Sequence, residues 1–145
     1  MRIAFGCDHG GWQLKEELMA HARELGHEVT DKGCFDQQSC DYPDFGEAAA
    51  RAVAAGEADR AVVVCTTGIG ISIAANKVAG VRCALCGGVW QAEMTRRHND
   101  ANALALGAGV TGPLLAKQIL EKFLTTGFEG GRHQRRVDKI GAIRP

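Results

Sequence analysis

A thiol followed by a glycine-rich loop is the clearest chemical feature of this sequence. Cys65 ends the apolar run 61–65, and Gly68 and Gly70 follow within five residues. Backbone N–H groups of such a loop, beside a helix N-terminus, stabilise an anion, either a bound phosphate or an oxyanion. The same environment favours a thiolate, which would make Cys65 a nucleophile or a base. The alternative is a core cysteine, the common fate of a Cys that ends a valine run.

Acid and imidazole groups occur together at two further points. Asp8 and His9 follow the first apolar run, where they can bind sugar hydroxyls or a phosphate and move protons. The alternative is that Asp8 only caps the next helix. His98 and Asn99 close a helical segment, and there the alternative is a favourable interaction of His98 with the helix C-terminus, with Asn99 as a cap.

The positive charge of the chain is local rather than spread. Lys and Arg number 17 and Asp and Glu number 17, so the formal net charge is zero, which argues against a nucleic-acid binder that works by bulk charge. Residues 130–145 nevertheless form a basic C-terminal tail. Within it Arg132 and Arg136 are four residues apart, so on a helix they share one face and can grip one phosphate. The alternative is a solvated basic run.

The cysteine count bears on the compartment and on cofactors. Six cysteines, the lack of an apolar h-region with a cleavage site before the domain, and the lack of a run of 18 apolar residues predict free thiols in a reducing cytoplasm, without a signal peptide or a membrane span. Cys83 and Cys86 have redox spacing, but on a strand their side chains point to opposite faces. We therefore expect no metal and no cofactor.

A nucleotide-binding protein of the flavodoxin or NAD-dependent kind is the weaker alternative. Gly68 and Gly70 supply two glycines of a dinucleotide fingerprint, but Ile73 stands at the third position. The acid expected about 20 residues further on is also missing, because residues 87–89 read Gly-Gly-Val.

The elements that must position these groups alternate along the chain. This alternation predicts a single three-layer α/β/α Rossmann-like domain, residues 1–145, with a parallel sheet of about five strands. Ligands in such sheets bind beyond the carboxyl ends of the strands, so residues 7–9, 65–70, 86–88 and 107–112 are the places to look. The expected strands are 2–7, 28–31, 61–65, 81–85 and 102–106, and the expected helices are 12–25, 44–55, 71–77, 90–97 and 114–124.

Five segments in order along nearly the whole chain resemble the type B ribose-5-phosphate isomerase family, which includes galactose-6-phosphate and allose-6-phosphate isomerases. No single segment is decisive, but the ordered set is highly specific. The segments are GCDHGG (6–11), DYP (41–43), CTTGIGISIAANK (65–77), HNDAN (98–102) and GGRH (130–133).

The resemblance implies a metal-free aldose–ketose isomerase that works through a cis-enediolate, with ribose 5-phosphate and ribulose 5-phosphate as the first expectation. It implies that Cys65 is the base, that Thr67 and His98 help to open the sugar ring, and that Asp8 contacts hydroxyls and assists proton transfer. It also implies a homodimer or homotetramer whose active sites take residues from two chains. The substrate-binding residues implied are Asp8, His9, Tyr42, Thr66, Gly68, Ile69, Gly70, Asn99, Arg132 and Arg136.

Two positions depart from the family pattern. Thr66 stands where many relatives have glycine, and Gly109 stands where many have an arginine that helps to hold the phosphate. A missing cationic contact weakens binding by roughly 1–3 kcal/mol. The departures leave two alternatives open: an isomerase of a hexose 6-phosphate or another aldose, and a non-catalytic module that binds a sugar phosphate.

Overall fold

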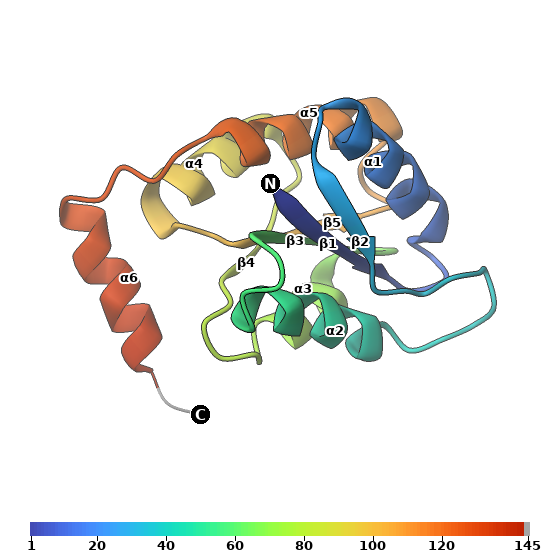
Figure 1. Cartoon of the computed structure of the whole chain (residues 1–145), viewed down its shortest axis with the longest axis horizontal. Helices are drawn as coiled ribbons and strands as arrows, with labels where there is room; N and C mark the ends of the chain where they lie inside the picture. The colour runs from blue at the N-terminus through green and yellow to red at the C-terminus, as the bar shows by residue number, and fades with distance from the viewer. Residues whose placement is uncertain (144–145) are drawn as a thin grey trace.

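A five-stranded parallel sheet forms the centre of the molecule in the computed structural model, which describes residues 1–143 (Figure 1). Its order is β2-β1-β3-β5-β4, and every pair of neighbours is parallel. Central β3 and β5 are apolar and buried on both faces, as a parallel sheet covered by helices requires. The strands are β1 (Arg2–Cys7), β2 (Glu28–Asp31), β3 (Arg60–Cys65), β4 (Cys83–Leu85) and β5 (Ala103–Gly107).

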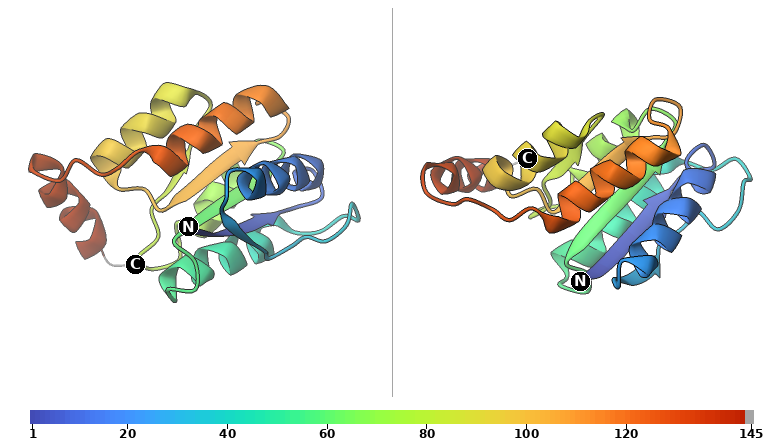
Figure 2. Two further views of the ribbon diagram at one scale, coloured as in Figure 1. Left: turned by 45° about the horizontal axis from the view of Figure 1, so that its top comes forward. Right: turned by 90° about the horizontal axis from the view of Figure 1, so that it is seen from above.

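Helices cover both faces of the sheet. Helices α1, α4 and α5 lie on one face and α2 and α3 on the other, which gives the three layers seen in Figures 1 and 2. The prediction of a three-layer α/β/α fold with about five parallel strands is therefore confirmed. The helices are α1 (Trp12–Glu24), α2 (Tyr42–Ala54), α3 (Ile69–Ala75), α4 (Val89–Asn99), α5 (Pro113–Thr125) and α6 (Arg132–Ala142).

The two layers of the core differ in side-chain size. Beneath α1 and α5 the sheet contributes large side chains such as Phe5 and Leu106, which pack against Phe123. Beneath α2 and α3 the core is rich in alanine, including Ala49 and Ala61. Small side chains let α2 and α3 lie close to the sheet, and α3 begins directly after the loop that follows Cys65.

Several helix boundaries differ from the predictions, and two of these differences concern Tyr42 and Asn99. Helix α2 begins at Tyr42 rather than Asp44, because Pro43 fits the first helical turn and Asp41 is the extended residue before it. Asn99 is the last residue of α4 and not its cap; Asp100, with a φ of 46°, takes that place. Each change moves a candidate site residue from a loop or a cap into a helix.

The basic tail contains a helix. Residues 132–142 form α6, which packs against α4 and projects from the body of the molecule in Figure 2. Arg144, the last arginine of the predicted tail, lies outside the described residues. Among the helices that the structure describes, none has the length and apolar character needed to cross a membrane.

Candidate active site

The carboxyl ends of the central strands bring one part of the predicted site together. Cys65 pairs with Gly107 across β3 and β5, and Cys7 pairs with Val64 across β1 and β3. The residues that follow these strands therefore emerge at one edge of the sheet. This edge carries Asp8, His9, Cys65, Thr66, Thr67, Gly68, Ile69 and Gly70, as the rule for parallel α/β sheets predicts.

Cys65 is held at this edge by its own loop. Its side chain is buried, and the backbone N–H of Gly68 donates to its sulfur at 3.1 Å. Gly68 has a φ of +76°, and a Cβ there would lie only 2.8 Å from the Leu106 carbonyl carbon. Glycine is thus required for the turn that directs an N–H donor at the thiol.

The sequence predicted that the backbone N–H groups of the loop after Cys65 would be free to face a ligand. Two of them instead bind side chains of the loop itself. The Gly68 N–H is directed at the Cys65 sulfur, and the Ile69 N–H donates to Thr67 Oγ1 at 3.2 Å. Thr66 and Thr67 are themselves exposed. Two of the predicted donors are therefore occupied within the loop, where they orient a thiol and a hydroxyl.

The loop after β1 holds the second acidic and imidazole pair. Asp8 is buried, and its Oδ1 accepts the N–H of Gly11, the residue before α1, at 3.1 Å. No side chain caps α1, so the capping role considered for Asp8 is not present. His9 is exposed, and its Nδ1 accepts the N–H of Cys40 at 3.2 Å. That hydrogen bond leaves Nε2 of His9 as the ring nitrogen that can carry a proton and meet a ligand.

Tyr42 reaches the same edge from the start of α2. A Cβ at Gly70 would lie 2.7 Å from Cε2 of the Tyr42 ring, so the ring packs directly on the loop after Cys65. The ring remains 40% exposed. Absence of a side chain at Gly70 is what lets this aromatic group and its hydroxyl approach the thiol loop.

The other predicted residues lie at the opposite edge of the sheet. Helix α4 begins after the carboxyl end of β4, so its last residues, His98 and Asn99, reach the amino edge. Arg132 and Arg136 are exposed on α6, which packs against α4. Within one chain, the structure does not bring these four residues to Cys65.

This second cluster is organised around a pair of stacked imidazoles. The rings of His98 and His133 are 4.1 Å apart and inclined by 9°. Oxygens of Glu129 lie 3.7 Å from Nε2 of His98 and 4.0 Å from Nε2 of His133. Sequence reasoning gave no role to Glu129 and His133, although 129–133 is a compact run of acid, glycines, arginine and histidine.

Positive charge surrounds the stacked rings. Desolvation, followed by the charges of His98 and Arg132, lowers the pKa of His133. Arg97 donates to Glu129 at 3.0 Å, so the carboxylate is already paired. Donor atoms of His98, Glu129 and His133 lie within 4.8 Å of one another, an arrangement that could hold a metal ion, which was not predicted from the sequence.

Two arginines fix the turn that presents His98 and Asn99. Arg82 Nη2 donates to the Asp100 carbonyl at 2.8 Å, and Arg96 Nη1 donates to the Asp100 carboxylate at 2.9 Å. Arg96 is almost fully buried. The end of α4 is thus held by paired charges rather than by strand pairing.

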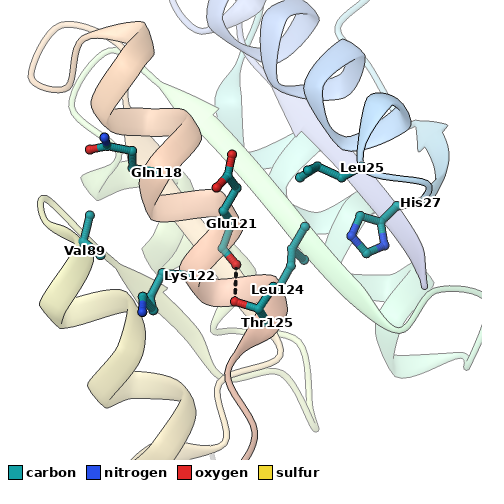
Figure 3. A pocket seen from close by; sticks show the side chains of 8 residues that line it. All are labelled: Leu25, His27, Val89, Gln118, Glu121, Lys122, Leu124 and Thr125. Carbon is teal, nitrogen blue, oxygen red and sulfur yellow. Dashed lines mark hydrogen bonds between the residues drawn. The ribbon is translucent and has the colours of Figure 1, made fainter.

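A hollow of about 660 Å³ lies elsewhere on the surface (Figure 3). None of the predicted site residues lines it. Its walls come from the end of α1, the start of α4 and the length of α5: Leu25, His27, Val89, Gln118, Glu121, Lys122, Leu124 and Thr125.

The fold and the carboxyl-edge cluster define an α/β protein with a thiol, a carboxylate and an imidazole poised for small polar ligands. The model of the Ribose/Galactose Isomerase family matches residues 3–140, and the chain belongs to that family. It is a sugar-phosphate isomerase, which interconverts an aldose and a ketose, and this favours an enzyme over the non-catalytic module.

Relatives match almost the whole chain. The chain is 51% identical to ribose-5-phosphate isomerase B of Escherichia coli, over 98% of this chain and 95% of that one. It is 39% identical to a galactose-6-phosphate isomerase subunit of Clostridium acetobutylicum, over 96% and 80%. The solved structure of Clostridium thermocellum ribose-5-phosphate isomerase B is 52% identical, with a TM-score of 0.96 over 97% and 95% of the two chains.

Proposed function

We propose that this protein interconverts ribose 5-phosphate and ribulose 5-phosphate, with Cys65 as the base. The observation that carries the proposal is the thiol at the carboxyl edge, with the Gly68 N–H 3.1 Å from its sulfur. Two relatives of about half-identical sequence are named ribose-5-phosphate isomerase B. Neither a metal nor a cofactor takes part in the proposed reaction.

The proton transfer follows from the chemistry of a thiolate. Cys65 removes the proton from C2 of the open-chain aldose, and the electrons of the C–H bond move toward the C1 carbonyl to give a cis-enediolate. The backbone of residues 66–70 stabilises the negative oxygen. Asp8 assists the transfer between the hydroxyls, and Cys65 returns its proton to C1 to give the ketose.

Ring opening and phosphate binding draw on both clusters. Thr67 and His98 move the protons that open the furanose ring. His9, Arg132 and Arg136 bind the phosphate, while Tyr42 and Asn99 line the sugar pocket. Since His98, Asn99 and both arginines lie at the far edge of the sheet, they reach Cys65 only from a second copy of the chain. We therefore propose a homodimer, or a homotetramer of such pairs, with shared active sites.

Exposed apolar side chains support pairing of two copies. They lie on α3, at the end of β4, at the start of α4, in the loop after β5 and at the start of α5, at the carboxyl end of the sheet. An apolar patch of this kind on a folded chain marks an interaction surface. Its members are Ile69, Ile73, Leu85, Trp90, Val110 and Leu114, with exposed fractions of 54%, 57%, 41%, 71%, 72% and 81%.

The six cysteines are all free. A reducing cytoplasm, the compartment proposed for this protein, maintains thiols in this state. The free state of Cys65 is what the proposed chemistry needs.

Turnover of purified protein on a panel of aldose phosphates tests the proposal. We expect ribose 5-phosphate to be the preferred substrate and Cys65→Ala to lower kcat by about 10³-fold, within the range for a lost general base. Cys83→Ala, which removes a thiol from β4, is the matched control and keeps its kcat. Full activity of Cys65→Ala, or no turnover of any aldose phosphate, would contradict the mechanism.

A hexose 6-phosphate is the second candidate substrate. Gly109 favours it, because it stands where the family pattern has a phosphate-binding arginine, and one relative is named a galactose-6-phosphate isomerase subunit. Higher kcat/KM on a hexose 6-phosphate than on ribose 5-phosphate in the same panel would select this alternative.

A further inference from the structure

Three thiols form a row beneath the carboxyl edge, outside the machinery of the proposed reaction. Cys7 ends β1 and is buried, Cys34 is buried in the segment after β2, and Cys40 is half-buried near the end of that segment. The sulfur atoms of Cys7 and Cys34 are 3.7 Å apart, and Cys40 is the next thiol, six residues further along the segment that carries Cys34. Cys34 thus has two possible partners.

The row is not a metal site. Among residues 1–143, the one group of three His, Cys, Asp or Glu ligands whose donor atoms all lie within 4.8 Å of one another is at His98, Glu129 and His133. The three thiols therefore do not surround a common point. Their arrangement, with Cys34 in the middle, suits exchange of a bond between sulfur atoms instead.

Backbone hydrogen bonds hold Cys7 and Cys34 side by side. The Cys7 N–H donates to the Gly33 carbonyl at 2.6 Å, and the Cys34 N–H donates to the Cys7 carbonyl at 2.8 Å. A disulfide needs sulfur atoms about 2.05 Å apart on neighbouring Cβ atoms. Because the two backbones are already adjacent, rotation of the side chains closes most of the remaining distance.

A buried ammonium group lies beside this pair. Lys15 is fully buried, and its Nζ donates to the Cys34 carbonyl at 2.6 Å. Burial raises the pKa of Cys7, and the charge of Lys15 opposes part of that effect. Burial likewise raises the pKa of Cys40. Cys7 and Cys40 are therefore protonated at neutral pH, and we expect their oxidation to accelerate as the pH rises.

We infer that Cys7 and Cys34 form a reversible disulfide when the protein meets a peroxide, with Cys40 as the entry thiol. The Cys40 thiolate attacks the peroxide, the O–O bond breaks, and water and a sulfenic acid result. Cys34 attacks the Cys40 sulfur and a second water leaves. Cys7 then attacks Cys34 and releases Cys40, which takes up the proton from Cys7. Two thiols lose two electrons and two protons, and the peroxide becomes two waters.

The new disulfide affects substrate binding through His9. In the reduced protein the Cys34 thiol donates to the Asp36 carbonyl at 3.2 Å, and the Cys40 N–H donates to Nδ1 of His9 at 3.2 Å. Turning Cys34 toward Cys7 breaks the first bond and frees residues 36–40, which loosens the second. We expect the KM for the sugar phosphate to rise, because the proposed function assigns phosphate binding to His9. This expected rise therefore rests on the proposed function.

The test uses the full chain, treated with hydrogen peroxide at neutral and at mildly alkaline pH and analysed by peptide mapping without reduction. We expect a peptide that joins Cys7 to Cys34, faster formation at the higher pH, and cleavage by dithiothreitol. No such peptide, or a stable Cys34–Cys40 peptide in its place, overturns the inference. This map needs no substrate, so its failure is distinct from failure of the proposed function.

Kinetics with a matched pair of variants test the link to His9. Peroxide should raise the KM for the sugar phosphate several-fold in the unchanged protein and in Cys83→Ser, and leave it unchanged in Cys34→Ser. The readout is KM, because oxidation of Cys65 lowers kcat in every variant. An equal rise of KM in Cys34→Ser overturns the link. If that variant does not fold, the peptide map decides alone.

Discussion

The two clusters of the candidate site are built in opposite ways. At the carboxyl edge, strand ends and backbone hydrogen bonds fix the reactive groups, and Cys65 and Asp8 are buried. At the amino edge, Arg132 and Arg136 extend from the surface of α6, and charge pairs such as Arg96–Asp100 fix the turn after His98. The first cluster resembles a reaction centre and the second a binding arm.

The comparison teaches why neither cluster is complete alone. The proposed base, Cys65, is buried at a sheet edge and needs other groups to hold a phosphate near it, but His9 is the one proposed phosphate binder at this edge. The amino-edge cluster carries the guanidinium groups but has no thiol among its predicted members. Each cluster supplies what the other lacks, which is the physical reason to expect two chains at one site.

The largest expected effect comes from mixing two inactive variants. Cys65→Ala alters the carboxyl-edge cluster and His98→Ala alters the amino-edge cluster, so each variant should be nearly inactive alone. If sites are shared, a mixed dimer has one intact site and one doubly altered site. Random exchange in an equal mixture then restores roughly a quarter of the normal kcat per chain, a rise of about 10²-fold.

The measurement is turnover after the two variants are unfolded and refolded together. Mixing without refolding is the control for contamination. A refolded mixture that stays as inactive as its components would show that each site uses residues of one chain. The two clusters would then not complete each other across two chains.

The next effect concerns the arm alone. Arg136→Ala should raise the KM for a phosphorylated sugar about 10-fold, with a smaller change in kcat, because a charge-assisted hydrogen bond is lost from the bound state. Arg135→Ala is the matched control, since Arg135 is an adjacent exposed arginine of α6 outside the predicted set. Steady-state kinetics that show the same KM for both variants would remove Arg136 from the phosphate site.

A several-fold effect is expected where the chain departs from the family pattern. A Cβ at Gly109 would lie 3.1 Å from the carbonyl oxygen and 3.2 Å from Cγ2 of Thr66, and the Gly109 N–H donates to that carbonyl at 2.8 Å. The two departures thus contact each other. Gly109→Arg should lower the KM for ribose 5-phosphate several-fold only when Thr66→Gly also removes the crowding methyl group.

Kinetics of the two single variants and the double variant measure this coupling. If Gly109→Arg lowers the KM for ribose 5-phosphate equally with Thr66 and with Thr66→Gly, the methyl group of Thr66 does not crowd the arginine. The outcome shows whether an arginine at position 109 can give the carboxyl-edge cluster a phosphate contact of its own.

Much of the carboxyl-edge cluster could be predicted from the sequence. Strands β1 and β2 were predicted with correct ends, and the parallel-sheet rule then placed Asp8 and Cys65 at one edge. The amino-edge cluster could not be assembled in this way. In α6 only His133 and Val137 are buried, so its sequence reads as a solvated tail. The stacking of His133 on His98 depends on packing between distant segments, which local patterns do not contain.

The smallest expected effect is on stability at alkaline pH, and it belongs to the carboxyl-edge side. Burial raises the pKa of Cys86 to about 11 from a usual value of 9.0. The folded state therefore keeps a proton that the unfolded chain loses, so this contribution to stability is complete below pH 9 and is lost as the pH rises toward 11. Thermal melts between pH 9 and pH 11 should show that the free energy of unfolding falls by about 1–2 kcal/mol less in Cys86→Ala than in the unchanged protein. The two proteins serve as their own controls at neutral pH, where the thiol does not titrate. Parallel declines above pH 9 would mean that the Cys86 thiol is ionised as easily in the folded state as in the unfolded one, and that this edge is more open to water than its buried thiols indicate.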